Sequence, residues 1–163
     1  RKVTSKPLIA KLSPNQTDIR ENARLCIEAG SDGLSVINTV MGMAIDPETR
    51  RPIIGNVQGG LSGPAIKPIA LLKVRQVWEV AAPRGIPILG QGGITTVNDA
   101  LEFLIAGATT LGIGTALFYD PLICRKINEG ITRYLAAHGL RDVSELVGTM
   151  VLPEDETTQS RAG

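Results

Sequence analysis

Short apolar segments alternate with amphipathic helical stretches four times along this chain. The apolar segments are bounded by proline or glycine and span residues 7–12, 33–38, 87–90 and 111–115. Each is followed by apolar residues at helical spacing, within residues 17–29, 64–81, 97–105 and 121–137. Thr17 or Asp18 can cap the first of these helices and Gly30 can end it, and Thr96 and Asp99 can form a capping pair for the third. Strands that alternate with helices at this period predict an α/β fold with a parallel sheet and right-handed crossovers. The near-continuous apolar character of the strands favours burial on both faces.

Two arrangements of a parallel sheet fit this alternation, an open doubly wound sheet and a (β/α)₈ TIM barrel. Four strand–helix units cannot close an eight-stranded barrel, so in the barrel case the chain forms a (βα)₄ half. We expect one domain over residues 1–150, because no linker or shift in composition interrupts it. A further short helix is expected at residues 143–147, and a flexible polar tail at residues 151–163.

The charge balance and composition exclude several classes of protein. Hydrophobic residues make up 43% and charged residues 20% of the chain, as in a folded globular protein. A formal net charge of +1 argues against a broad surface for nucleic acid or anionic membrane. No apolar run reaches the roughly 18 residues that span a bilayer. Because the N-terminal residues also lack an apolar signal core, we predict a cytoplasmic location.

The cysteines and the single histidine are interpreted as structural residues. Cys26 and Cys124 are too few and too far apart for a disulfide scaffold or a zinc site, and no metal site is expected. Each lies on the apolar stripe of an expected helix, which predicts a small buried hydrophobic residue. His138 lies at the end of the last long helix, where we expect it to satisfy backbone carbonyls.

Polar residues and glycines gather where the expected strands end, which is where parallel α/β folds place their sites. The first strand ends near Lys11, the third runs into Gly92-Gly93 and the fourth into Gly114-Thr115. Glycines after two adjacent strands let backbone N–H groups approach a phosphate, so we expect both pairs to line one concavity. The short helix at residues 143–147, or another helix N-terminus, could add positive dipole there. The alternative is that the glycines only make tight turns.

The other strand-end residues leave more than one interpretation open. Lys11 either faces a ligand or pairs with a carboxylate inside the fold. Asn38 and Thr39, after the second strand, offer amide and hydroxyl groups suited to a planar polar ligand. Residues 40–63 form an unusually long connection, and their pattern predicts a hairpin. Such a hairpin would serve as a lid over the pocket or as a contact surface for a partner.

Taken together, the motifs resemble those of class 1 dihydroorotate dehydrogenases, with the best fit to the NAD-linked branch. The matching segments are KLSPN (residues 11–15), INT (37–39), GMAID (42–46), GGLSGPAIKPIAL (59–71), GQGGI (90–94), DALEFLIAGA (99–108) and GTALF (114–118). The resemblance runs from about residue 7 to residue 149 in the family's order and spacing, and GGLSGPAIKP is its most specific motif. It implies that the chain is the C-terminal half of a TIM barrel.

The resemblance also implies a cofactor and a reaction. The family oxidises dihydroorotate to orotate through FMN, in pyrimidine biosynthesis. The residues implied to bind FMN are Lys11, Ile37, Gly63, Gly92, Gly93, Gly114 and Thr115, and those implied to bind the substrate are Asn38 and Thr39. Lys11 would lie near the pyrimidine edge of the flavin and Ile37 would pack on its ring. The implied partners are a second copy of the full-length protein and a subunit that carries FAD and an iron–sulfur cluster.

One element of the family pattern is missing from this sequence. The family's base is a cysteine in a loop that precedes the segment present here, and neither Cys26 nor Cys124 matches it. We therefore expect no catalytic residue within the 163 residues and no activity from them alone. The alternatives are a dihydropyrimidine dehydrogenase-like flavoenzyme, a flavin-free phosphate-binding barrel isomerase or lyase, and a half-barrel without catalytic activity.

Overall fold

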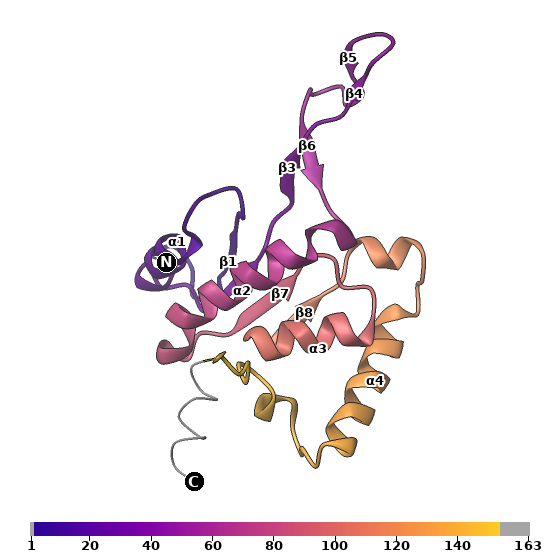
Figure 1. Ribbon diagram of the computed structural model, residues 1–163. Helices are drawn as coiled ribbons and strands as arrows, with labels where there is room; N and C mark the ends of the chain where they lie inside the picture. The colour runs from indigo at the N-terminus through magenta and orange to yellow at the C-terminus, as the bar shows by residue number, and fades with distance from the viewer. Residues whose placement is uncertain (1, 154–163) are drawn as a thin grey trace.

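A parallel sheet of four strands forms the centre of the computed structural model, which describes residues 2–153 (Figure 1). The strands are β1 (Ile9–Leu12), β2 (Gly33–Val36), β7 (Ile88–Gln91) and β8 (Thr110–Gly112). They lie side by side in the order β1-β2-β7-β8, so each strand pairs with its neighbour in the α/β repeat. The first and last strands are not paired with each other, which confirms the expected open (βα)₄ arrangement.

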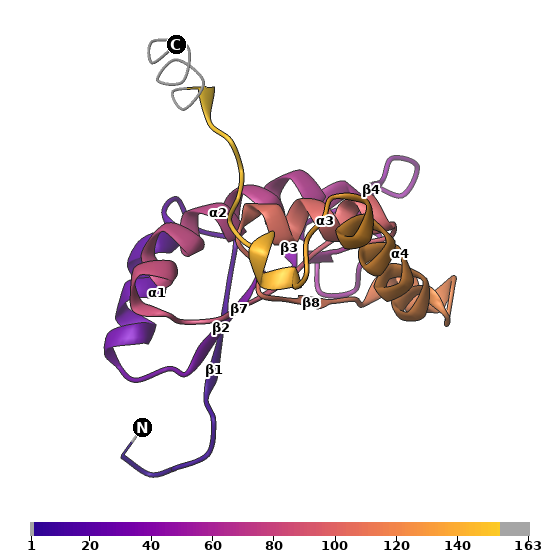
Figure 2. The same ribbon diagram turned by 90° about the horizontal axis from the view of Figure 1, so that it is seen from below.

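Four long helices form a single layer over this sheet. They are α1 (Ile19–Glu28), α2 (Lys67–Ala81), α3 (Val97–Ala106) and α4 (Ile123–Ala137). Each helix packs against the next one along the chain, and α1, α2 and α3 lie on the same side of the strands (Figure 2). A doubly wound sheet would carry helices on both faces. Because the long helices lie over one face of the sheet, the structure favours the half-barrel over the doubly wound sheet.

The core lies between the sheet and this helical layer. The strands contribute Leu34, Val36 and Ile88, and α2 contributes Val74 and Val77; all five are almost completely shielded from solvent. Burial of side chains of this size stabilises the fold by about 1.5–3 kcal/mol each. The apolar spacing that predicts α2 is therefore the spacing that packs it on the sheet.

The expected helix boundaries are explained by local capping. The side chain of Asp18 accepts a hydrogen bond from the backbone N–H of Arg20 at the start of α1. Thr96 and Asp99 form a reciprocal capping box at the start of α3, as the sequence predicts. Gly30 follows α1 with φ of 93°, a conformation that glycine adopts without steric cost. These caps confirm the predicted starts of α1 and α3 and the predicted end of α1.

Residues 40–61 form a two-part hairpin that extends away from the sheet (Figure 1). At its base, β3 (Val40–Gly42) pairs with β6 (Gly59–Leu61) in antiparallel fashion, and at its tip β4 (Ile45–Asp46) pairs with β5 (Arg51–Pro52). Its larger apolar side chains are exposed: Met41, Met43, Ile45, Ile53, Ile54, Val57 and Leu61. The predicted hairpin is confirmed, and it presents an apolar surface.

Short 3₁₀ helices connect the main elements, and two of them correct the sequence-based boundaries. They are η1 (Pro64–Ile66), η2 (Ala82–Arg84), η3 (Thr115–Phe118) and η4 (Val143–Glu145). The predicted fourth strand, residues 111–115, was too long: β8 ends at Gly112 and Thr115 already begins η3. The predicted helix at residues 143–147 is only η4. Residues 154–163, most of the predicted flexible tail, lie outside the described residues.

The two edges of the sheet carry apolar side chains that no described element covers. Ile9 on the edge strand β1 is 59% exposed. Beside β8, a second cavity of about 540 Å³ lies between that strand and α4, and Cys124 lines it. The prediction of a buried Cys124 was wrong: Cys124 is exposed at the start of α4, although Ile127, one turn further along the same stripe, is buried. Cys26 is half-buried and packs against the core.

Gly90, in the middle of β7, is expected to tolerate no side chain. A Cβ atom there would lie 2.6 Å from Cβ of Ala108 and 2.9 Å from Cδ1 of Phe103. Gly90→Ala should lower the free energy of unfolding by about 1–3 kcal/mol through overpacking. Urea unfolding of the protein expressed from its natural gene, followed by circular dichroism, measures this change.

The matched control for this prediction is Gly55→Ala in the hairpin, where nothing lies within 4 Å of the added methyl group. This control should change the free energy of unfolding by less than about 0.5 kcal/mol. Equal stabilities for the two variants would contradict the tight packing of β7 beneath α2 and α3.

Candidate functional site

A cavity of about 250 Å³ lies at the carboxyl ends of the four strands. Residues near the carboxyl ends of the strands and in the segments after them line it: Lys11, Ile37, Asn38, Thr39, Ser62, Gly63, Ile66, Gln91, Gly92, Gly93, Ile94, Thr95, Gly112, Ile113, Gly114, Thr115 and Ala116. All nine residues that the sequence analysis assigned to a cofactor or a substrate are among them. The strands run parallel, so their carboxyl ends meet at one rim. The structure therefore brings the nine residues together at one cavity.

The two glycine pairs line this one concavity, as expected. Gly92 has φ of 132° and Gly93 has φ of 81°, conformations that residues with a Cβ rarely adopt. A Cβ atom on Gly93 would lie 2.8 Å from the carbonyl oxygen of Gly63. The turn after β7 thus approaches the start of α2 so closely that only glycine fits. Such a turn leaves backbone groups accessible to a ligand without an intervening side chain.

The loop before α2 is also tied to the loop after β8. The hydroxyl groups of Ser62 and Thr115 lie 3.1 Å apart and share a hydrogen bond. Gly63, next to Ser62, has φ of 91° and is buried. The short helix at residues 143–147 was expected to add positive dipole to the glycine concavity. It lies elsewhere, because Val143 and Leu146 pack against α3. The concavity is therefore built from loop backbone and two hydroxyl groups.

Lys11 supplies the positive charge at the cavity wall. It projects from β1, next to the buried Leu12, and among the residues that the structure describes it takes part in no ion pair or side-chain hydrogen bond. The alternative in which Lys11 pairs with a carboxylate of the fold is not seen within residues 2–153. An ammonium group without a partner at a cavity wall is available to a ligand.

Three residues that follow β2 line the cavity, one of them apolar and two polar. Ile37 is 3% exposed, whereas Asn38 is exposed and Thr39 is half-buried. The side-chain amide of Gln91 donates a hydrogen bond of 3.0 Å to the carbonyl oxygen of Ile37. The side chain of Asn15 donates to the carbonyl oxygen of Thr39 at 3.0 Å and accepts from the backbone N–H of Met41 at 2.9 Å.

Gln91 and Asn15 are residues of the site region that the sequence analysis did not single out. Gln91 lies between two glycines of GQGGI, and its position at the end of β7 was the available signal. Asn15 is part of the turn after β1 and does not line the cavity; it holds the backbone from Thr39 to Met41. Thr39 and Met41 lie more than 20 residues from Asn15, so no local pattern indicates these two contacts.

A largely shielded ion pair lies directly behind the glycine turn. Nζ of Lys67 is 2.6 Å from Oδ1 of Asp99 and 2.8 Å from a carboxylate oxygen of Glu102. Burial by itself would raise the pKa of Asp99, but hydrogen bonds from Lys67 and Thr95 outweigh it and hold that pKa far below its usual range. The same contacts, first with Asp99 and then with Glu102, raise the pKa of Lys67. Both groups of the pair are therefore charged at neutral pH.

The parallel sheet with helices over one face defines half of an α/β barrel. Its cavity lies at the carboxyl ends of the strands, where barrels of this kind place their sites. The family described as Dihydroorotate dehydrogenase matches residues 1–135. The chain belongs to the dihydroorotate dehydrogenase family. Within residues 2–153, no helix combines the length and the apolar character that a membrane crossing requires.

Curated relatives are similar over nearly the whole chain. "Dihydroorotate dehydrogenase B (NAD(+)), catalytic subunit" of Geotalea uraniireducens (strain Rf4) is 54% identical over 151 residues, which are 93% of this chain and 48% of the relative. The protein of the same description from Geobacter sulfurreducens is 55% identical over 150 residues, 92% of this chain and 48% of the relative. The chain therefore spans about half the length of the curated relatives it matches.

A solved structure has the same fold. The crystal structure of DHODH in complex with ferulenol from Eimeria tenella superimposes with a TM-score of 0.73 at 29% sequence identity. The match covers 88% of this chain and 38% of that one. The fold of this chain is thus that of part of a dihydroorotate dehydrogenase barrel.

The Lys67–Asp99 pair makes the stability of the site region dependent on pH. Because the folded-state pKa of Asp99 is depressed, its contribution is complete above the unfolded pKa of about 4 and is lost as the pH falls below that value. Asp99→Asn should lower the free energy of unfolding at pH 7 by about 2 kcal/mol, between the values typical of surface and buried pairs.

Urea unfolding of the wild-type protein and of Asp99→Asn between pH 7 and pH 3 measures this contribution. The difference between them should be constant down to about pH 5 and then shrink. The more exposed pair between Lys126 and Asp120, also 2.6 Å long, provides the control variant Asp120→Asn. A difference for Asp99→Asn that grows on acidification would contradict the sign of the pKa shift.

Proposed function

We propose that this chain forms the flavin-binding half of a dihydroorotate dehydrogenase that oxidises dihydroorotate to orotate through FMN, in pyrimidine biosynthesis. The observation that carries the proposal is the convergence of the nine motif residues on one cavity at the carboxyl rim of the sheet. The name shared by the curated relatives supports the reaction. The cytoplasmic location stays a prediction.

The residues of the cavity fit the parts of FMN. Gly92, Gly93, Gly114 and Thr115 form a backbone-lined concavity in which a Cβ on Gly93 would meet the carbonyl oxygen of Gly63, as expected of a phosphate cradle. The buried Ile37 supplies an apolar surface for the flat ring system. Gly63 keeps the backbone before α2 free of a side chain next to the cofactor.

FMN bound here would supply the acceptor for the hydride that leaves dihydroorotate. The side chain of Lys11 would hold a positive charge against the pyrimidine edge of the ring system, where negative charge develops during the reaction. Asn38 and Thr39 would donate hydrogen bonds to the substrate ring or its carboxylate. The proton leaving the neighbouring carbon needs a base that the described cavity residues do not include.

The chemistry of the cavity wall disfavours the flavin-free alternative. A barrel isomerase or lyase that moves protons needs a carboxylate or a second ionisable group opposite its lysine. The described residues that line the cavity include Lys11 but no aspartate or glutamate. A dihydropyrimidine dehydrogenase-like enzyme would use the same flavin site, and the relatives' shared name favours dihydroorotate as the substrate.

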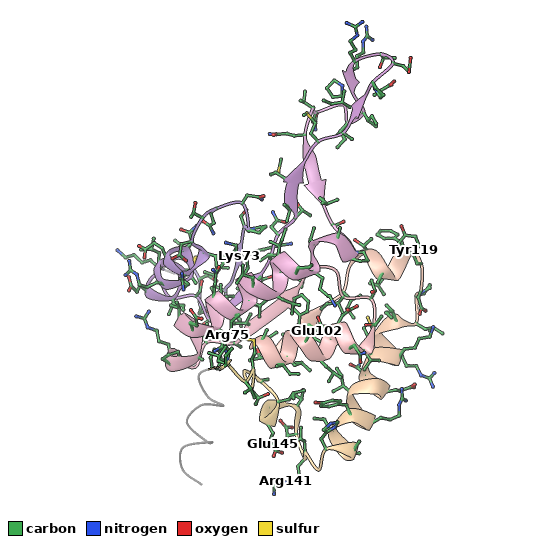
Figure 3. All side chains as sticks on the ribbon, viewed as in Figure 1. Lys73, Arg75, Glu102, Tyr119, Arg141 and Glu145 are labelled. Carbon is green, nitrogen blue, oxygen red and sulfur yellow. The ribbon has the colours of Figure 1, made fainter. Side chains whose placement is uncertain are left out.

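We also propose that the full-length protein is a homodimer and works with a subunit carrying FAD and an iron–sulfur cluster. The words "catalytic subunit" in the relatives' names support a partner subunit. The hairpin of residues 40–61 extends away from the sheet with exposed apolar side chains (Figures 1 and 3). This direction favours a contact surface over a lid.

The proposed flavin site predicts a yellow protein. The protein expressed from its natural gene should release FMN on denaturation, identified by its absorbance and chromatographic mobility. A colourless protein that takes up no added FMN would overturn the proposed function. Binding of FMN without any oxidation of dihydroorotate, when other dihydropyrimidines are oxidised, would favour the dihydropyrimidine dehydrogenase-like alternative.

Lys11→Ala should slow reduction of bound FMN by dihydroorotate, measured by stopped-flow bleaching under anaerobic conditions. Removing the charged donor closest to the developing negative charge costs on the order of 10²-fold in rate. The control is Lys2→Ala, whose side chain is exposed outside the cavity. A wild-type bleaching rate in Lys11→Ala with full FMN occupancy would contradict the role given to Lys11.

A further inference from the structure

Lys67 and Asp99 link two segments that are 32 residues apart in the sequence. Lys67 is the first residue of α2, and Asp99 lies in the first turn of α3. The side chain of Asp99 is 11% exposed and that of Lys67 is 25% exposed, so the pair is largely shielded from water. An ion pair in this setting is much stronger than one on an open surface.

Asp99 also holds the turn that follows the two glycines. Its second carboxylate oxygen, Oδ2, accepts hydrogen bonds of 2.9 Å from the backbone N–H groups of Thr95 and Thr96 and from the hydroxyl of Thr95. Thr95 lines the cavity two residues after Gly93. One carboxylate therefore connects the ammonium group of α2 to the backbone of the turn from Gly92 to Thr96.

The backbone of the same turn touches the start of α2. A Cβ atom on Gly93 would lie 3.0 Å from Cβ of Lys67 and 3.1 Å from its backbone nitrogen. The ion pair thus lies behind the point at which the two cavity-lining loops approach each other. Glu102, one turn further along α3 (Figure 3), contacts the same ammonium group at 2.8 Å but is 44% exposed.

We propose that Lys67 and Asp99 are positioning residues that fix the Gly92–Gly93 turn against the start of α2 and thereby set the phosphate side of the cavity. Lys67 neutralises the Asp99 carboxylate, which would otherwise present an uncompensated negative charge close to a bound phosphate. Asp99 in turn fixes the direction of the turn's backbone groups. This inference rests on the proposed function, because it assigns the pair to the phosphate of FMN.

The test compares FMN with riboflavin, which lacks the phosphate. The two dissociation constants are measured by flavin fluorescence in the apoprotein prepared from the protein expressed from its natural gene. In Lys67→Met, the ratio of the riboflavin to the FMN dissociation constant should fall about tenfold, equivalent to about 1.4 kcal/mol. Riboflavin binding itself should change less than about twofold, because the ring-binding residues are untouched.

Three variants separate positioning from general damage. Lys67→Arg keeps the charge and should restore the ratio to within about threefold of wild type. Lys67→Gln keeps most of the side-chain stem, so it serves if Lys67→Met does not fold, and its ratio should also fall. The exposed Lys126, which pairs with Asp120 at 2.6 Å, provides the control Lys126→Met, whose ratio should equal that of wild type.

The outcomes distinguish this inference from the proposed function. A wild-type protein that binds neither flavin overturns the proposed function and the inference with it. If wild type binds FMN but folded Lys67→Met or Lys67→Gln keeps the wild-type ratio, the inference alone is wrong. An equal loss of affinity for both flavins also overturns it, because that result indicates damage to the whole pocket. A reduced ratio that Lys67→Arg restores supports it.

Discussion

The close approach of the turn after β7 to the start of α2 is the contact on which the rest of the site depends. Gly93 lies against the carbonyl oxygen of Gly63 and the backbone of Lys67, at distances that leave no room for a Cβ atom. Because two loops meet here without side chains between them, their backbone groups line one concavity. The Lys67–Asp99 pair lies behind the same contact, and Ser62 and Thr115 extend the link to the loop after β8.

Within residues 2–153, the sheet that carries these loops is open at both edges. Strands β1 and β8 each pair with one described neighbour, and apolar groups such as Ile9 and the cavity beside α4 are exposed there. An unpaired parallel strand presents free backbone donors and acceptors as well as apolar side chains. The chain spans about half the length of its curated relatives, and these two edges are where further barrel strands would pair.

Much of the candidate site could be predicted from the sequence because strand ends are marked locally. Lys11, the Asn38-Thr39 pair and the glycines each follow an apolar run, and parallel strands bring such positions to one rim. Gln91 was missed although it lies within a recognised motif, since its hydrogen bond to Ile37 spans 54 residues. Cys124 was misjudged because helical periodicity identifies an apolar face without showing whether another element covers it.

The sequence by itself determined the order and direction of the elements, the helix caps at Asp18 and Thr96, and the family. These features depend on periodicity, capping and short motifs, which act over a few residues. Only the tertiary structure decided that all the helices form one layer, that the hairpin extends away from the sheet, and that Lys67 meets Asp99. Those outcomes depend on how helices pack across the sheet. Packing joins residues that are distant in the chain, so no local pattern encodes it.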